Sequence, residues 1–122
     1  MPVTYQIDVA HRVVFTHGFG TVTDSDLLQH NVDLKADPNF DPTFNQLLNF
    51  TEVIHSDVKS ETIYGIASNR IFNLSSLRAI VVKPGLQYGF ARMFQNLRIL
   101  EDKNIEVFLD IDEARTWLGL EK

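Results

Sequence analysis

Polar side chains that could bind a ligand or carry a phosphate follow two apolar segments of strand length. The segments are Gln46–Thr51 and Arg78–Lys83, and the side chains are Ser56, Asp57, Ser60, Lys83, Tyr88 and Arg92. If both segments are parallel strands, their carboxyl ends lie at one edge of a sheet, where open α/β folds bind ligands. Positive charge and a hydroxyl group near a helix amino terminus suit a carboxylate or a phosphate. We therefore predict a ligand or regulatory site in the loops Thr51–Lys59 and Lys83–Tyr88.

Each of these side chains also has an ordinary structural role. Ser56 or Ser60 could cap the helix that is expected to follow, and Ser60 is the better placed of the two. A phosphate near a helix start is electrostatically favoured as well, so capping and phosphorylation are compatible. Lys83 could simply be solvated, and Arg92 could pair with a surface carboxylate. The spacing leaves the functional and the structural interpretation open.

Motifs for other kinds of catalysis or metal binding are missing from the sequence. There is no cysteine, no Gly-x-Ser-x-Gly elbow and no Gly-rich phosphate loop. The histidines are His11, His17, His30 and His55, and no pair has the i, i+4 spacing of a metal-binding helix. We expect His17, between Phe15 and Phe19, to be a core or interface histidine with one hydrogen bond. The sequence thus predicts a protein that is not an enzyme and has neither cofactor nor metal.

Two groups of carboxylates fall where helices are expected to begin. The first is Asp24 with Asp26, and the second is Asp110 with Asp112 and Glu113. Carboxylates in a first turn interact favourably with the positive end of the helix dipole. That interaction accounts for both groups without catalysis or metal binding.

The length and composition indicate a single globular domain spanning residues 1–122. The chain is 44% hydrophobic and 22% charged, so it has enough apolar surface for a core of its own. A formal net charge of −5 argues against binding to nucleic acid or to an anionic membrane surface. The amino terminus does not resemble a signal peptide, and no apolar run approaches the ~20 residues of a membrane span. We expect a cytoplasmic protein.

Strand and helix patterns alternate along the chain. Strands are predicted at Thr4–Asp8, Arg12–Val22, Gln46–Thr51, Arg78–Lys83 and Glu106–Asp110, and the first two should form a hairpin. Helices are predicted after Thr23 as far as Asp37, after Ser60, over Leu86–Leu100, and after Asp110 or Asp112 as far as Gly119. This order predicts an α/β fold with a mixed sheet of about five strands and about four helices.

The second strand has one bulky face and one face of small residues. The small face carries Val14, Thr16, Gly18, Gly20 and Val22. Small residues allow close approach by a helix or by a neighbouring chain. A homodimer that uses this face is therefore one expectation.

Several strings in this order resemble the SpoIIAA-like, or STAS-type, family, and especially its stand-alone bacterial branch described as STAS and CRAL-TRIO-like. The strings are Gly20–Leu28, Leu47–Phe50, Arg78–Val82, Gly89–Phe94 and Val107–Gly119. The resemblance covers nearly the whole chain and implies a single-domain SpoIIAA-like sandwich. In anti-sigma-factor antagonists of this fold, an Asp-Ser-Ser/Thr-Gly loop after the central strand is phosphorylated. This chain has His55–Ser60 there, without the glycine or the hydroxyl pair, so the resemblance implies a phosphorylation site only as a question about Ser56 or Ser60.

The expected function is that of a non-enzymatic STAS-like module that binds a protein partner or a small ligand through the two loops. The alternative is a carrier or sensor of a small apolar or lipid-like molecule, as the CRAL-TRIO likeness implies. That alternative needs a cavity beneath the helix that carries Phe90, Met93, Phe94 and Leu97. Helical spacing does not distinguish a pocket wall from a filled core.

Overall fold

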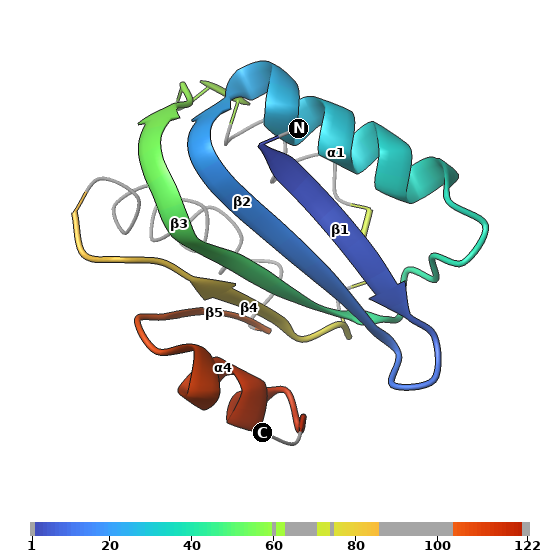
Figure 1. The fold of residues 1–122 in the computed structure, drawn as a ribbon. Coiled ribbons are helices and arrows are strands. Elements are labelled where there is room, and N and C mark those ends of the chain that lie inside the picture. Colours follow the sequence, from blue (N-terminus) through green and yellow to red (C-terminus); the bar gives the residue numbers. More distant parts are fainter. Residues whose placement is uncertain (1, 60, 63–70, 74, 86–103, 121–122) are drawn as a thin grey trace.

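The computed structural model of the protein describes residues 2–59, 61–62, 71–73, 75–85 and 104–120. Its elements are β1 (Val3–Asp8), β2 (Val13–Thr23), α1 (Asp24–Ala36), β3 (Asn45–Asp57), β4 (Arg78–Val81), β5 (Ile105–Phe108) and α4 (Ile111–Trp117). The strands form one sheet in chain order (Figure 1). β1 is antiparallel to β2, and all the other neighbours are parallel. The predicted mixed five-stranded sheet with its amino-terminal hairpin is confirmed.

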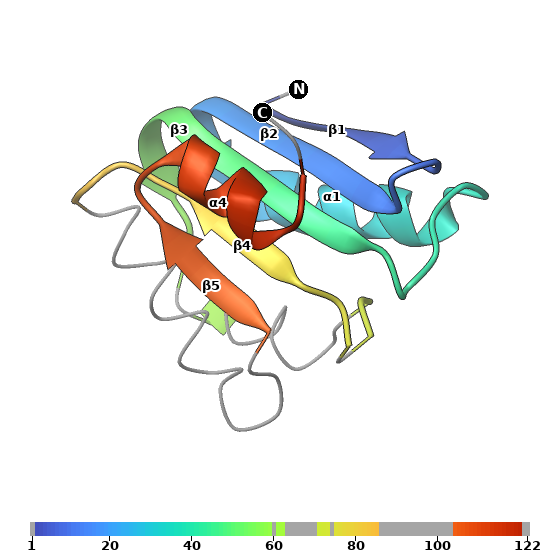
Figure 2. The ribbon, with the colours of Figure 1, turned by 90° about the horizontal axis from the view of Figure 1, so that it is seen from below.

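Two of the four predicted helices lie within the described residues, and they cover opposite faces of the sheet. In Figure 2, α4 lies on the near side of β3 and β4, and α1 lies behind the strands. The other two predicted helices, after Ser60 and over Leu86–Leu100, fall largely or wholly outside the described residues. Neither described helix is long and apolar enough to cross a membrane.

The alternation of side chains along the strands divides the core into two layers. Leu47, Ala79 and Val81 point toward α4 and pack with its Ala114 and Leu118. The next residues in each strand, including Ile80 and Val107, point the other way and pack in a second cluster with Val22 and Leu27. All four residues of β4 are buried. The continuous apolar run Arg78–Lys83 predicts a central strand covered on both faces, and this prediction is correct.

The ends of α1 follow from local capping. The side chain of Thr23 accepts a hydrogen bond from the Asp26 backbone, and the Asp26 carboxylate accepts one from the Thr23 N–H, which forms a capping box. The helix ends at Ala36 because Pro38 disfavours helical geometry at Asp37. The sequence also predicts an apolar stripe on this helix, formed by Leu27, Leu28, Val32 and Leu34, and this prediction is only partly correct. Leu34 is fully buried, but Leu28 and Val32 are 49% and 61% exposed.

Most of the small-residue face of β2 is covered within the chain itself, although Gly20 is only half-buried, so little of this face is left for the second chain that the homodimer expectation required. Thr16 is 2% exposed, and Gly18 is buried against the ring of Phe50. Val14 packs with Leu34 of α1. The close approach is made by the chain's own helix and by Phe50, and this surface gives no support to a homodimer.

Substitution of Gly18 by alanine should destabilise the fold by about 1–3 kcal/mol, a typical cost of overpacking. A Cβ atom at this position would lie 2.5 Å from Cδ1 of Phe50, so the ring would have to move. Urea unfolding measures the loss. In a double-mutant cycle, Phe50→Leu should recover part of it, and independent, additive losses would contradict the contact.

β3 is longer than the sequence predicts. The segment Thr51–Lys59 was expected to be a loop, but β3 continues to Asp57 and pairs with Phe19–Thr23 of β2. Two register shifts, between His17 and Phe19 and between Gly20 and Thr21, interrupt this pairing. Shifts of this kind increase strand twist. The polar residues of this segment were misread as a loop because one of its faces is exposed.

The carboxyl-terminal elements agree more closely with the sequence. β5 ends at Phe108, two residues before the predicted end at Asp110. Asp110 caps α4, with its carboxylate accepting a hydrogen bond from the Asp112 backbone at 2.9 Å. Gly119 follows the helix at a φ of +79°, a conformation that glycine adopts without strain.

Candidate functional site

The structure does not place the predicted site residues at one common edge. Ser56 and Asp57 lie at the end of β3, opposite Val22 and Thr23. Lys83 is exposed just after β4. However, the last residue of β4, Val81, pairs with Asn49, well before the end of β3. The two strand exits are therefore at different levels of the sheet. The other predicted site residues, Ser60, Tyr88 and Arg92, lie outside the described residues.

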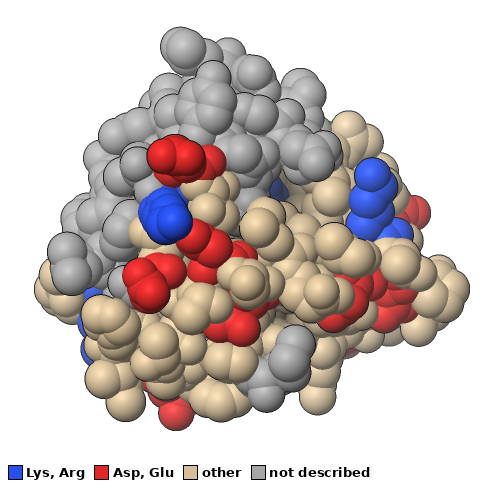
Figure 3. Space-filling model, turned by 90° about the horizontal axis from the view of Figure 1, so that it is seen from above, with Lys and Arg blue, Asp and Glu red and all other residues tan. Residues whose placement is uncertain are grey.

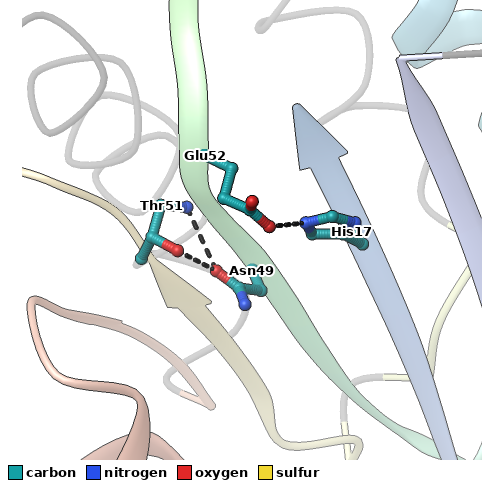
Figure 4. A network of polar contacts seen from close by, with 4 residues as sticks. All are labelled: His17, Asn49, Thr51 and Glu52. Carbon is teal, nitrogen blue, oxygen red and sulfur yellow. Dashed lines mark hydrogen bonds and ion pairs between the residues drawn. The ribbon is translucent and has the colours of Figure 1, made fainter. Parts of the chain in front are cut away.

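The segment of β3 beside the exit of β4 carries a cluster of polar side chains, which we call the open-face cluster. Its members are His17, Asn49, Thr51 and Glu52 (Figure 4). Nε2 of His17 lies 2.6 Å from a carboxylate oxygen of Glu52, with the two side chains 40% and 66% exposed. The Thr51 hydroxyl donates to the Asn49 side-chain oxygen at 2.7 Å, and the Thr51 N–H donates to the same oxygen at 3.1 Å. The first register shift brings these side chains together from β2 and β3.

The hydrogen bonds of the open-face cluster hold its side chains in place but do not form a pair of nucleophile and base. The hydroxyl of Thr51 is engaged with Asn49 and not with His17, so the histidine has no nucleophile to activate in the cluster. A polar contact this exposed contributes little to stability. His17 makes the polar contact to Glu52, and of the two expected positions, core or interface, its 40% side-chain exposure excludes the core.

Apolar side chains are exposed around the open-face cluster. The ring of Phe19 is 5.5 Å from that of His17, and Phe19 is 39% exposed. Ile54 is the extra residue at the second register shift and is 86% exposed. Val53 belongs to the buried cluster on the α1 side, whereas Ile54, at the register shift, is exposed to solvent. A single exposed apolar residue is common on protein surfaces. Here Phe19 and Ile54 are exposed on neighbouring strands close to an ordered polar cluster, and a partner could cover them together.

A chain of buried hydrogen bonds lies on the other face of the sheet, beneath α1. Its members are Arg78, Gln46, Thr16 and His30, which are 7%, 1%, 2% and 7% exposed. Nε of Arg78 donates to Gln46 at 3.1 Å, and the Gln46 amide donates to the Thr16 hydroxyl at 3.0 Å. Thr16 is in turn 3.1 Å from Nε2 of His30. The chain joins three adjacent strands to the helix.

The direction of these hydrogen bonds determines the state of His30. Because Thr16 accepts from Gln46, its own proton is available for Nε2 of His30, and Nδ1 then donates to the side chain of Asn31 at 3.2 Å. Burial lowers the pKa of His30, and the nearby Arg78 guanidinium lowers it further. The hydrogen bond to Asn31 and the Asp33 carboxylate act in the opposite direction. The neutral imidazole completes the chain.

Tyr5 covers the outer side of His30. The two rings are in edge-to-face contact with centroids 5.7 Å apart. The Tyr5 hydroxyl donates to the Asp37 carboxylate at 2.8 Å. Burial, together with this hydrogen bond, raises the pKa of Tyr5 to about 12. Tyr5 therefore stays protonated and ties β1 to the end of α1.

The sequence analysis missed this buried chain, although a signal was present. Gln46 and Arg78 begin two apolar strand segments and pair side by side in the sheet. His30 lies one helical turn before Leu34, on the buried side of α1. Polar residues at inward positions of neighbouring elements are a signature of a buried network. Because all four side chains are buried, they serve structure rather than ligand contact.

The surface that carries α1 is acidic. In Figure 3, the red of acidic side chains predominates over blue on this face. Asp24 and Asp26 lie in the first turn of α1, and Asp24 also accepts a hydrogen bond from the Lys59 backbone at 2.9 Å. Within the described part of the chain, no three His, Asp or Glu side chains are placed to share a metal ion. The acidic face is poorly suited to a nucleic-acid backbone.

The comparisons with known proteins identify the fold. No protein-family model matches the chain, and no curated protein matches it significantly. Among solved structures, it is similar to an uncharacterized protein of the DUF3478 family from Shewanella loihica PV-4, which is described as having a SpoIIAA-like fold. The TM-score is 0.61 at 18% sequence identity, and the match covers 95% of this chain and 93% of the other. The sequence-based expectation is confirmed at this level: the chain has a SpoIIAA-like fold.

Proposed function

We propose that this protein is a non-enzymatic STAS-like interaction module that binds a protein partner through the open-face cluster and its apolar neighbours. The observation that carries the proposal is the 86% exposure of Ile54 beside the ordered His17–Glu52 pair. Protein interfaces combine an apolar centre with a polar rim, and this surface has both parts. The similar protein of known structure is itself uncharacterized, so it supports the fold but not a particular partner.

Two of the residues predicted from the sequence belong to the strand that carries Ile54. Ser56 and Asp57 follow Ile54 on the same strand. A phosphate on Ser56 would add about 1.5 to 2 negative charges close to the interface. We therefore include phosphorylation of Ser56 as a proposed control of partner binding. Intact-mass measurement in several growth states tests it, and an unmodified chain in all of them would remove this part of the proposal.

The partner proposal is tested by placing a photo-crosslinking residue at Ile54 in the full chain in cells. We expect one defined adduct. The control position is Val9, which is 54% exposed in the turn between β1 and β2, at the other end of the sheet (Figure 1). An adduct of twice the 14.0 kDa chain mass would identify a second copy as the partner. Equal crosslinking at both positions, or none at Ile54, would contradict the proposal.

Once the partner is known, Ile54→Asp should weaken binding at least about tenfold. In the proposed complex the partner covers Ile54, and the variant would place a charge in that apolar contact. Val9→Asp is the matched control and should leave binding unchanged. Both side chains are exposed in the free chain, so each variant should keep its stability within about 0.5 kcal/mol.

A further inference from the structure

A hollow lies beside α4, separate from the open-face cluster. It is a shallow hollow, largely open to solvent, with a volume of about 540 Å³. The residues that line it are Phe108, Asp110, Asp112, Glu113, Thr116 and Trp117. They come from the end of β5 and from the first two turns of α4.

Two aromatic rings form the apolar part of this hollow. The rings of Phe108 and Trp117 are 5.6 Å apart and inclined at 54°. Both pack against the buried cluster that contains Leu47, Ala114 and Leu118, which holds them in place. Both are nevertheless only half-buried, so part of each residue remains accessible from the hollow.

Carboxylates supply the charge. Asp110 is engaged at the helix cap, where it accepts from the Asp112 backbone. Asp112 and Glu113 are exposed, and the described residues give their carboxylates no hydrogen bond or ion pair. No Lys or Arg occurs among the lining residues that the structure describes. The guanidinium of the neighbouring Arg115 lies over Phe15, at 5.9 Å from the ring centre.

We propose that this hollow is a binding site for a small alkylammonium cation, such as a quaternary ammonium group. An ammonium group is attracted to aromatic faces, most strongly to that of tryptophan. It is also attracted to carboxylates, whereas an anionic ligand would be repelled by them and a neutral ligand could gain only hydrogen bonds. The helix dipole explains why carboxylates occur in the first turn, but not why they share a hollow with two aromatic rings. This site differs from the proposed partner surface in both location and ligand, so either proposal can fail without the other.

The test uses Trp117, which is the sole tryptophan of the chain and lines the hollow. Choline is titrated into the full chain while indole fluorescence and the amide NMR signals of residues 110–117 are recorded. We expect a saturable change in both. The neutral isostere 3,3-dimethyl-1-butanol has the same shape without the charge and should cause little change. The titration extends to about 10 mM choline. A site with a Kd of about 1 mM would be mostly occupied at that concentration.

Two double variants are compared. Each removes one aspartate and one glutamate charge, the first pair inside the hollow and the second pair outside it. The double variant Asp112→Asn with Glu113→Gln should weaken choline binding at least about tenfold and keep the helix, because the Asp110 cap is untouched. The control, Asp33→Asn with Glu61→Gln, alters exposed residues outside the hollow and should bind choline as the original chain does. Three results would overturn the proposal: no saturable response to choline, an equal response to its neutral isostere, or equal weakening in both double variants.

Discussion

Replacement of Gln46 by methionine should lower the free energy of unfolding by about 2–4 kcal/mol. Methionine has a similar length, so little cavity arises, but the hydrogen bonds to Arg78 and Thr16 are lost. Loss of the acceptor for a buried charged donor costs far more than loss of an exposed hydrogen bond. Urea unfolding followed by circular dichroism measures the change.

The matched control is the same substitution at Gln6, an exposed position on β1, which should change stability by less than about 0.5 kcal/mol. The double variant Thr16→Val with Gln46→Met should lose less stability than the sum of the two single variants. The reason is that both partners of one buried hydrogen bond are replaced together. If Gln46→Met were as mild as Gln6→Met, the buried hydrogen bonds would contribute nothing to stability.

Acidification should destabilise the fold through His30. The ordinary histidine pKa is 6.5, and burial lowers the pKa of His30 in the folded chain. Above pH 6.5 the group is neutral in both states and does not affect the pH dependence. Below that pH the unfolded chain binds a proton that the folded chain resists, so stability falls. It stops falling once the pH is below the folded-state pKa as well.

The measurement is a series of urea unfolding curves from about pH 8 to about pH 5. His30→Gln should be less stable but should show a flatter profile in this range. His55→Gln, at an exposed histidine of β3, should keep the original profile. Asp8 and Asp41 do not contribute to the change in stability between about pH 8 and about pH 5. Backbone hydrogen bonds from His11 and Thr43 hold their pKa values below the usual 3.8, outside this range. An unchanged profile in His30→Gln would show that His30 is not the group responsible.

The groups that face His30 come from every element around it. They are Tyr5 of β1, Thr16 of β2, Asn31 and Asp33 of α1, and Arg78 of β4. Protonation would disturb the hydrogen bond that joins α1 to the sheet. Residues of the open-face cluster and of the buried hydrogen-bond network alternate along the same two strands, β2 and β3.

The sequence by itself determined the features that depend on local periodicity and capping. The apolar run in β4 predicted a strand covered on both faces, and Thr23 and Asp110 marked the starts of α1 and α4. These signals are readable because strand alternation and the orphan N–H groups of a first turn act within a few residues. With the resemblance, they were sufficient for the SpoIIAA-like fold.

Only the tertiary structure decided which polar residues lie together. Gln46 and Arg78 meet through strand register, and His30 joins them through the packing of α1. The length of β3 was likewise hidden, because its second half has an exposed polar face and, among the residues that the structure describes, pairs with β2 alone. The open-face cluster and the hollow beside α4 combine residues from different elements. Such contacts depend on register and helix docking, which are set by the whole core rather than by any one segment.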